Sequence, residues 1–307
     1  MAGMKSLNDT LIEAVGASNV LRDEPMSAHT TFRVGGPADW FVTPGSADEL
    51  RAVLLVCKEQ GVRPYVMGRG SNLLVADEGL RGVVVQIAQN MADVDVADDG
   101  VVTAQAGVTN AKVAALACRA GLAGYEFAAG IPGTVGGAAI MNAGAYDGEF
   151  RDVAVGVTCL TADYEVVKVP AAQADWSYRH SMMGDAGMIV LDATLQLRPG
   201  DPEAIQARMD DLAQRRSSKQ PLDMPSAGST FKRPPGHFAG KLIQDAGLQG
   251  HAVGGAMVSP KHAGFVVNTG DATANDVLQL IQEVQATVQS QFGVTLEPEV
   301  RLWGFDL

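Results

Sequence analysis

A glycine-rich stretch from Gly124 to Phe150, GYEFAAGIPGTVGGAAIMNAGAYDGEF, constrains the fold more than any other part of the chain. It holds seven glycines but only three charged residues, all of them acidic. Glycine weakens helices and strands, so this density indicates backbone that turns tightly or lies flat against another group. A flexible linker would favour serine and charge, whereas this stretch also carries Phe127, Ile131 and Ile140. We therefore expect a ligand-binding loop with close backbone approach rather than a linker.

A second glycine-rich segment, GRGSNLL from Gly68 to Leu74, lies between apolar strands expected at Tyr65–Met67 and Gly82–Ile87. A turn of this kind can offer backbone N–H groups to a phosphate. It is not a Walker A loop, because no Gly-Lys-Ser/Thr follows, and it lacks the third glycine of the dinucleotide-binding fingerprint. Taken alone, the segment is compatible with an ordinary tight turn as well as with a phosphate loop.

Apolar periodicity and capping residues predict helices that begin at Ser46, Thr109, Asp201 and Thr273. The last of these has Asp276 as the partner in a capping box and ends at Gly293. Strand patterns are expected in four further places: a strand, a Gly-Gly turn and a second strand over His29–Pro44, hairpins around 98–100 and over 153–169, and an alternating strand at Met188–Leu197.

Composition excludes several classes of protein. Hydrophobic residues make up 47% of the 307 residues and no apolar run approaches the thickness of a bilayer, so we expect an ordinary globular protein without a membrane span. The N-terminus lacks the pattern of a signal peptide. A net charge of −12 argues against general binding to nucleic acid or to a membrane surface. Three widely spaced cysteines indicate reduced thiols in a cytoplasmic protein, not a disulfide framework or a metal site.

Basic residues nevertheless gather in the last third of this acidic chain. Between residues 215 and 261 only Asp223 and Asp245 are acidic. The basic residues of this region are Arg215, Arg216, Lys219, Lys232, Arg233, Lys241 and Lys261. Such an island suits a bound anion such as a phosphorylated small molecule, although a solvated surface would give the same pattern. Few aromatic residues interleave with the charges, so a nucleic-acid surface is disfavoured.

Eight segments in order resemble the UDP-N-acetylenolpyruvoylglucosamine reductase (MurB) family. They are HTTFRVGGPA, MGRGSNLLV, GYEFAAGIPGTVGGAAIMNAGAY, SYRHS, AGSTFKRP, AGKLIQDAGLQG, SPKHAGFVVN and LEPEVRLWG. The resemblance implies an α+β fold: an FAD-binding domain of the vanillyl-alcohol-oxidase type, made of two α+β subdomains, and a C-terminal α+β substrate-binding domain. We expect these parts at residues 1–90, 91–200 and 201–307.

The resemblance further implies non-covalent FAD, held by the two glycine-rich segments and by one upstream arginine. A pyrophosphate needs backbone N–H groups, and a flavin ring needs flat, close backbone, so both expectations suit these segments. The cofactor-binding residues expected are Arg33, Gly68, Arg69, Gly70, Ser71, Asn72, Leu73, Gly130, Ile131, Pro132, Gly133, Thr134, Gly136, Gly137, Asn142, Gly144 and Ala145.

In the reaction that the resemblance implies, NADPH reduces the flavin, which then reduces an enolpyruvyl ether and builds negative charge on the carbon next to its carboxylate. Arg179 in SYRHS and Glu299 in LEPEV match the family's positions that stabilise this charge, and Ser229 in AGSTF matches its proton donor. Two residues apart, Glu297 and Glu299 would share one face of a strand, so spacing alone does not separate them. Glu299 is favoured because the family's acid directly precedes Val-Arg.

The expected substrate is a UDP-sugar, and no obligatory protein partner is inferred. The substrate-binding residues that match the family are Lys219, Lys232, Lys241, Gln244 and Asn268. The chain lacks the inserted tyrosine loop of some members. It also departs from the usual pattern at Gln244, where Glu is common, and at Gly264, where Asn is common.

Two other functions fit part of this pattern. A flavin oxidase acting on an alcohol or a sugar lactone could use the same fold, but it would need a base for the alcohol and not the Arg179, Ser229 and Glu299 set. A flavin- or nucleotide-binding regulator without turnover would need none of these three residues. We therefore favour the reductase.

Overall fold

The computed structural model describes residues 5–306, which form two compact units, each assembled from separate segments of the chain. The first contains the residues up to Leu21, Trp40–Arg69 and Gly82–Arg215, and the second contains Arg22–Asp39, Gly70–Arg81 and the residues from Arg216 onward. This division groups residues that pack together. The domain boundaries expected at residues 90 and 200 remain a prediction.

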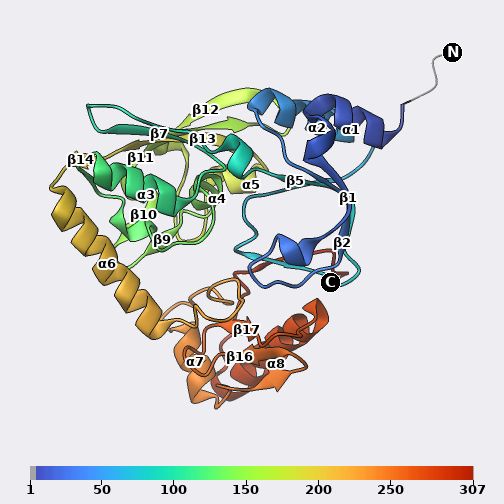
Figure 1. Ribbon diagram of the computed structural model, residues 1–307. Helices are drawn as coiled ribbons and strands as arrows, with labels where there is room; N and C mark the ends of the chain where they lie inside the picture. Colours follow the sequence, from blue (N-terminus) through green and yellow to red (C-terminus); the bar gives the residue numbers. More distant parts are fainter. Residues whose placement is uncertain (1–4, 307) are drawn as a thin grey trace. The chain divides into compact units, whose positions relative to one another are not determined.

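A five-stranded antiparallel sheet is the framework of the first unit (Figure 1). Its strands, in spatial order, are β12 (Val166–Pro170), β11 (Ala154–Leu160), β13 (Ile189–Gln196), β7 (Val101–Gln105) and β6 (Val94–Val96). The two hairpins and the alternating strand predicted from the sequence are thereby confirmed. The short helix α4 (Val135–Ile140) packs on β13. The predicted helix after Thr109 is α3 (Asn110–Arg119).

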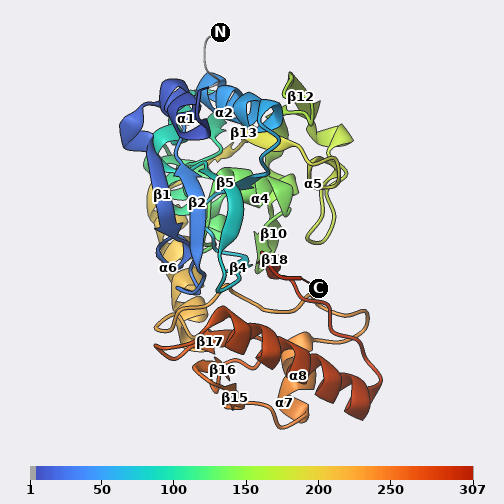
Figure 2. The same ribbon diagram turned by 90° about the vertical axis from the view of Figure 1, so that its right-hand side faces the viewer.

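A four-stranded sheet has the order β1 (Val20–Pro25), β2 (Pro37–Val42), β5 (Leu80–Gln86) and β3 (Pro64–Met67), as Figure 2 shows for its first three strands. Between β2 and β3 the chain forms α2 (Ala47–Glu59), which buries Leu50, Val53, Leu54 and Cys57 as its periodicity predicts. Burial raises the pKa of the Cys57 thiol to about 11, so this cysteine stays protonated at neutral pH.

The strand predicted before the Gly-Gly turn is wrong. Thr30, Phe32 and Val34 are buried alternately, as in a strand, but the backbone around them is a series of turns. The Thr30 hydroxyl donates to the Val34 carbonyl at 2.9 Å, the Arg33 N–H donates to the Thr30 carbonyl at 3.1 Å, and Arg33 has a φ of 56°. Alternate burial produced by turns therefore mimicked a strand, and the strand that pairs with β2 is β1.

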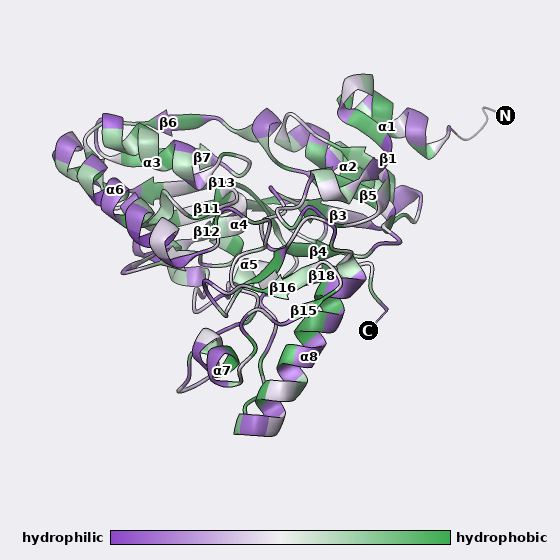
Figure 3. Ribbon diagram, turned by 60° about the horizontal axis from the view of Figure 1, so that its bottom comes forward, coloured by the Kyte–Doolittle hydropathy of each residue, from purple (hydrophilic) through white to green (hydrophobic). Residues whose placement is uncertain are grey.

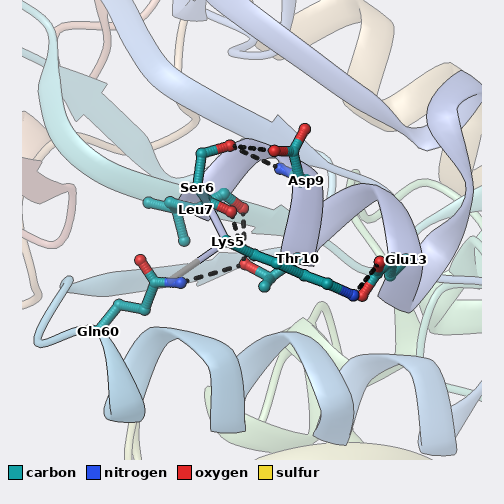
Figure 4. Close-up of polar contacts among 7 residues, drawn as sticks. All are labelled: Lys5, Ser6, Leu7, Asp9, Thr10, Glu13 and Gln60. Atoms are coloured by element: carbon teal, nitrogen blue, oxygen red, sulfur yellow. Dashed lines mark hydrogen bonds and ion pairs between the residues drawn. The ribbon is translucent and has the colours of Figure 1, made fainter. Parts of the chain in front are cut away.

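The first helix, α1 (Leu7–Val15), packs on α2 and is closed at its start by side chains (Figure 4). The Ser6 hydroxyl accepts the Asp9 N–H at 3.2 Å and donates to the Asp9 carboxylate at 2.7 Å. The amide of Gln60, just after α2, donates to the Thr10 hydroxyl at 3.2 Å. These bonds fix α1 against the end of α2.

The second unit joins a strand from early in the chain to the C-terminal region. Strand β4 (Leu73–Val75) pairs in parallel with β18 (Arg301–Trp303), close to the C-terminus. The other elements are α7 (Ala239–Asp245), the antiparallel strands β15 (Ala252–Val253), β16 (Ala256–Val258) and β17 (Val266–Asn268), and the helix α8 (Ala274–Phe292).

Helix α8 follows its sequence pattern closely. Thr273 and Asp276 form the predicted capping box, and Gly293 ends the helix in the left-handed conformation with a φ of 68°. Its buried face contains Val277, Leu280, Ile281, Val284 and Val288. In Figure 3 the ribbon of α8 carries both hydrophobic and hydrophilic bands along its length, as expected of an amphipathic helix.

Five short elements and one long helix, α6 (Pro202–Lys219), are also present. The short elements are β8 (Leu122–Ala123), β9 (Gly144–Ala145), β10 (Gly148–Glu149), α5 (Met182–Asp185) and β14 (Arg198–Pro199). Helix α6 buries Ile205, Met209 and Leu212, as expected of the helix that begins at Asp201. Within residues 5–306 no helix combines the length and apolarity needed to cross a bilayer.

The carboxylate of Asp77, just after β4, accepts the N–H groups of Ala274 at 2.7 Å and Asn275 at 2.9 Å at the start of α8. We predict that Asp77→Ala lowers the free energy of unfolding by about 1–2 kcal/mol, because it leaves two helix N–H groups without their acceptor. Urea denaturation measures this loss. Asp98→Ala, in the exposed hairpin turn between β6 and β7, is the control, and an equal loss there would contradict the prediction.

Candidate active site

Gly68, at the start of GRGSNLL, lies against the Gly124–Phe150 stretch within the first unit. A side chain on Gly68 would place its Cβ 2.6 Å from the Thr134 hydroxyl, closer than atoms can approach. The Gln86 amide also donates to the Gly68 carbonyl at 3.2 Å. The family resemblance implied that the two glycine-rich segments hold one cofactor. Gly68 and Thr134 lie side by side, and their shared role in binding the cofactor remains a prediction.

The start of α4 leaves exposed backbone. Thr134 caps this helix, and Gly133 before it has a φ of 105°, which only glycine adopts readily. A Cβ on Gly136 would lie 2.8 Å from the Cβ of Ala106, so this glycine permits close packing within the protein. A Cβ on Gly137 would have no neighbour nearer than 3.8 Å, and Gly137 is exposed. Packing within the unit therefore explains Gly136 but not Gly137.

The remaining predicted residues of this stretch differ in exposure. Gly130 and Pro132 are exposed, and Ile131 is half-buried against the core. Gly144 and Ala145 form β9, where a Cβ on Gly144 would lie 2.9 Å from the Glu149 side chain. Gly144 is thus explained by packing against β10.

The end of α4 is tied to the loop that carries Arg179. The last carbonyls of a helix have no partner within the helix. Here the Trp176 indole N–H donates to the Ala139 carbonyl at 2.7 Å, and the Ser181 hydroxyl donates to the Ile140 carbonyl at 2.7 Å. The loop from Trp176 to Ser181 is therefore fixed at both ends to one helix terminus.

Asn142 holds the middle of this loop from a buried position. Its side-chain N–H groups donate to the Ser177 carbonyl at 3.1 Å and the Glu149 carboxylate at 2.9 Å, and its oxygen accepts the Arg151 N–H at 3.0 Å. Asn142 is 1% exposed and has a φ of 41°. Its amide is engaged within the protein, and its expected contact with the cofactor remains a prediction.

Arg179 itself lies at the tip of a tight turn. The backbone N–H of Ser177 donates to the His180 carbonyl, and the N–H of His180 to the Ser177 carbonyl, each at 3.2 Å. Arg179 has a φ of 56°, which is unfavourable for a residue with a side chain. Its half-buried guanidinium lies 5.3 Å from the ring centre of Tyr178.

The second unit brings the segments of Ser229 and Glu299 together. Thr230 is buried, its N–H donates to the Gly264 carbonyl at 2.9 Å, and its own carbonyl accepts the Glu299 N–H at 2.8 Å. Asn72 joins them, because its side chain donates to the Glu299 carbonyl at 3.1 Å. Ser229, next to Thr230, is exposed.

The structure separates the two glutamates that spacing could not. Residues 294–300 form no strand beyond a single bridge between Pro298 and Phe231, so the expectation of a strand there is wrong. The exposed Glu297 carboxylate forms an ion pair with Lys232, whereas Glu299 is half-buried.

The residues expected to bind substrate lie in different environments. Lys219 is exposed at the last position of α6, and Lys241 and Gln244 are exposed on α7, where Lys241 forms an ion pair with Asp245. Asn268 is buried, and its amide donates to the Phe32 carbonyl at 3.0 Å while its oxygen accepts the Gly270 N–H at 2.8 Å.

The rest of the GRGSNLL segment, after Gly68, is shaped by packing. Gly70 has a φ of 63°, and a Cβ there would lie 2.1 Å from the His29 carbonyl oxygen. Ser71 and Asn72 are half-buried, and Leu73 is buried in β4. Arg33 and Arg69 are exposed.

Comparison with known proteins shows which family this chain resembles in sequence. A sequence model of the FAD binding domain matches residues 38–170, and one of the UDP-N-acetylenolpyruvoylglucosamine reductase C-terminal domain matches residues 220–303. The reductase of that name from Agathobacter rectalis is 49% identical, over 97% of this chain and 99% of its own. The chain belongs to the UDP-N-acetylenolpyruvoylglucosamine reductase family.

Solved structures support the same family and the predicted fold. The reductase of Thermus caldophilus superposes with a TM-score of 0.79 and 36% identity, covering 92% of this chain and 98% of that one. The 4-ethylphenol oxidase of Gulosibacter chungangensis, at 15% identity, has a TM-score of 0.50 over 97% of this chain and 66% of its own. The predicted fold class, an α+β FAD-binding domain of the vanillyl-alcohol-oxidase type with a C-terminal domain, is confirmed.

FAD fits the first unit on physical grounds. Exposed backbone at Gly130, Pro132 and Gly137 offers the flat surface that a flavin nucleotide needs, and Gly137 lacks a side chain without any packing reason. Family members bind FAD through the domain that matches here, so this member of the family is a flavoprotein oxidoreductase.

Several residues that support the predicted site were not assigned a role from the sequence. Trp176 and Ser181 donate side-chain hydrogen bonds to distant carbonyls, and Thr230 bonds Gly264 and Glu299 through its backbone, which no local pattern reveals. The departure at Gly264 also has a local explanation, because a Cβ there would lie 3.0 Å from the ring of His262. His262 accepts the Gly264 N–H at 3.1 Å and occupies the space that a side chain would fill.

We predict that Asn142→Ala lowers the free energy of unfolding by about 2–4 kcal/mol, because it removes all three side-chain hydrogen bonds of a buried amide at a residue with positive φ. Asn90→Ala removes an exposed amide that donates to the Thr43 carbonyl at 3.0 Å, and should cost less than about 1 kcal/mol. Urea unfolding of both variants gives the comparison. Similar losses would mean that the Asn142 bonds contribute little.

Proposed function

We propose that this protein uses FAD and NADPH to reduce the enolpyruvyl group of UDP-N-acetylglucosamine enolpyruvate, forming UDP-N-acetylmuramate for peptidoglycan precursors. The observation that carries the proposal is the 49% identity, over nearly the full length of both chains, to a reductase named for this substrate. The predicted division into two FAD-binding subdomains and a substrate domain, and a cytoplasmic location, are parts of the same proposal.

The cofactor would be held without a covalent bond by the segments around Gly68 and Gly130–Gly137, with Arg33 and Arg69 as the cations of the predicted set. When bound, FAD supplies a hydride acceptor for NADPH and a hydride donor for the enolpyruvyl group. Exposed backbone at Gly130 and Gly137 supports this assignment, since a bulky side chain at either position would occupy the surface needed by the cofactor.

Residues of the chain would stabilise the negative charge that forms on the substrate and would supply the proton that neutralises it. Addition of hydride to the enolpyruvyl group leaves negative charge on the carbon beside its carboxylate. We assign Arg179 to the carboxylate, because a guanidinium offers a planar pair of donors to it. Glu299 can stabilise the same charge only as a protonated hydrogen-bond donor. Ser229, exposed beside the anchored Thr230, would deliver the proton to that carbon.

Lys232 and Lys241 would bind the diphosphate of the substrate by releasing the carboxylates with which they are now paired. Lys232 is paired with Glu297 and Lys241 with Asp245, and all four side chains are at least partly exposed. Exposed ion pairs contribute only about 0–1 kcal/mol, so a diphosphate can replace these carboxylates at small cost. Lys219 and Gln244 are exposed and could contact the substrate directly, whereas Asn268, buried and bonded to Phe32, would support the site from within.

An anaerobic experiment tests the reaction directly. The purified protein is reduced with one equivalent of NADPH, and its flavin absorbance is followed after addition of the enolpyruvyl substrate. Rapid reoxidation is expected. Reoxidation by oxygen alone, with no response to the substrate, would instead indicate a flavin oxidase, and a protein that cannot take up FAD would refute both.

We predict that Ser229→Ala leaves the reduction of the flavin by NADPH within about twofold of the wild-type rate, while reoxidation by substrate slows by on the order of 10²–10⁴-fold. Only the second half-reaction requires a proton donor to carbon. Stopped-flow absorbance separates the two steps. Ser226→Ala, in the same loop, is the control, and equal slowing of both steps in Ser229→Ala would make Ser229 structural.

We predict that Gly137→Ala keeps the stability of the apoprotein within about 1 kcal/mol, because the added methyl group meets no atom and alanine favours helices. Binding of FAD, measured by flavin fluorescence quenching, should weaken at least about tenfold if the cofactor lies on this surface. Gly136→Ala is the contrasting variant, since it must destabilise the apoprotein by clashing with Ala106. Unchanged FAD affinity in Gly137→Ala would place the cofactor elsewhere.

A further inference from the structure

His180, the residue after Arg179, spans the loop that carries Arg179. Its Nδ1 lies 2.9 Å from the backbone carbonyl oxygen of Asp175, and its Nε2 lies 2.8 Å from the carboxylate of Asp185. Asp175 precedes the turn and Asp185 is the last residue of α5, which follows it. The imidazole ring therefore joins the two ends of a single loop.

Both partners of the ring are acceptors. A backbone carbonyl and an ionised carboxylate can only accept hydrogen bonds, so each ring nitrogen must carry a hydrogen to bond its partner. A neutral imidazole has one such hydrogen and an imidazolium has two. The geometry is satisfied in full only by the charged form.

The backbone next to this ring adopts conformations that are unfavourable for residues with side chains. Asp175 and Arg179 have φ values of 46° and 56°, which residues with side chains adopt only when the surroundings hold them. Trp176, Ser177 and Ser181 are each fixed by a hydrogen bond to or from the region around α4. The Met182 N–H joins the two ends of the loop by donating to the Ala174 carbonyl at 2.8 Å, and the His180 ring adds a side-chain link between them.

We propose that His180, as an imidazolium held between Asp175 and Asp185, is a positioning residue that fixes the turn presenting Arg179. The inference rests on the proposed function, since it treats Arg179 as the residue that meets the substrate carboxylate. His180 itself contacts neither substrate nor cofactor in this scheme. We call the two hydrogen bonds of the His180 ring, to Asp175 and Asp185, the His180 brace. Loss of this brace would let the Arg179 guanidinium leave its position without unfolding the first unit.

The brace depends on pH. The hydrogen bond to the Asp185 carboxylate, followed by that to the Asp175 carbonyl, raises the pKa of His180 above its ordinary value of 6.5, against a smaller opposing effect of burial. The other charged groups around the loop are Arg179, beside His180, and Arg151, whose guanidinium donates to the Trp176 carbonyl and pairs with Glu149. Because the folded-state pKa is raised, the stabilisation is complete below pH 6.5 and is lost as the pH rises through the raised pKa.

Kinetics of the two half-reactions test the role in positioning. His180→Gln and Asp185→Asn should slow reoxidation of the flavin by the enolpyruvyl substrate on the order of tenfold near neutral pH, with flavin reduction by NADPH within twofold. The wild-type reoxidation rate should fall as the pH rises through the pKa of His180, and His180→Gln should lack this step. His251→Gln is the control, because His251 forms a similar pair with Glu283 at 2.7 Å on elements without predicted catalytic residues. An unchanged reoxidation rate, or an equal slowing of both steps together with a lower melting temperature, would overturn the proposal.

Nuclear magnetic resonance tests the brace without turnover. In the wild-type holoprotein the ring nitrogens of His180 should titrate above pH 6.5, and the backbone amide of Arg179 should shift with the same midpoint. Asp185→Asn should lower both midpoints together. An Arg179 amide that does not respond, or a His180 midpoint that Asp185→Asn leaves unchanged, would refute the brace. If the brace titrates as expected but wild-type flavin is not reoxidised by the substrate, the proposed function fails and the role of Arg179 falls with it.

Discussion

The close approach of α4 to neighbouring backbone is the constraint on which the first unit depends. Gly136 donates its N–H to the Ala106 carbonyl at 2.9 Å, at a distance that a side chain on Gly136 would prevent. The start of the helix is thereby fixed beside Gly68, through Thr134. Its end supplies the carbonyls that hold Trp176 and Ser181. One helix of six residues therefore positions both the expected cofactor surface and the loop of Arg179.

In the second unit, too, hydrogen bonds hold predicted site segments together, and here the segments lie farther apart in the sequence. Asn72 and the Glu299 carbonyl, 227 residues apart, are joined by a hydrogen bond, and β4 and β18 extend this contact as a parallel pair. Since Thr230 bonds Glu299 as well, the segment of Ser229 is held by the backbone that also fixes part of the predicted cofactor loop. Residues expected to bind cofactor and residues expected to transfer a proton thus share their support.

Local signals in the sequence predicted local structure well. The capping box at Thr273, the periodicity of α2 and the alternation of β13 depend on residues near one another in the chain, and each element formed as expected. The false strand before the Gly-Gly turn shows the limit, because turn bonds at Thr30 and Arg33 gave alternate burial without a strand. The ion pair of Lys232 with Glu297 depends on tertiary contacts, so spacing could not separate Glu297 from Glu299. Family resemblance, not pattern, supplied the choice.

The left-handed backbone at residues with a predicted role could not be predicted, for a related reason. Among the described residues other than glycine, Arg33, Asn142 and Arg179 combine a predicted role in the site with a positive φ. The intrinsic preference of each residue opposes that conformation, by roughly 1–2 kcal/mol for a residue with a Cβ, so the sequence argues against it. Glycine at position 179 would remove the strain and, with it, the guanidinium. Keeping an arginine there requires hydrogen bonds on both sides of the turn, and those of Trp176, Ser177, His180 and Ser181 provide them. The density of hydrogen bonds around Arg179 therefore offsets the cost of holding a residue with a side chain in a conformation that favours glycine.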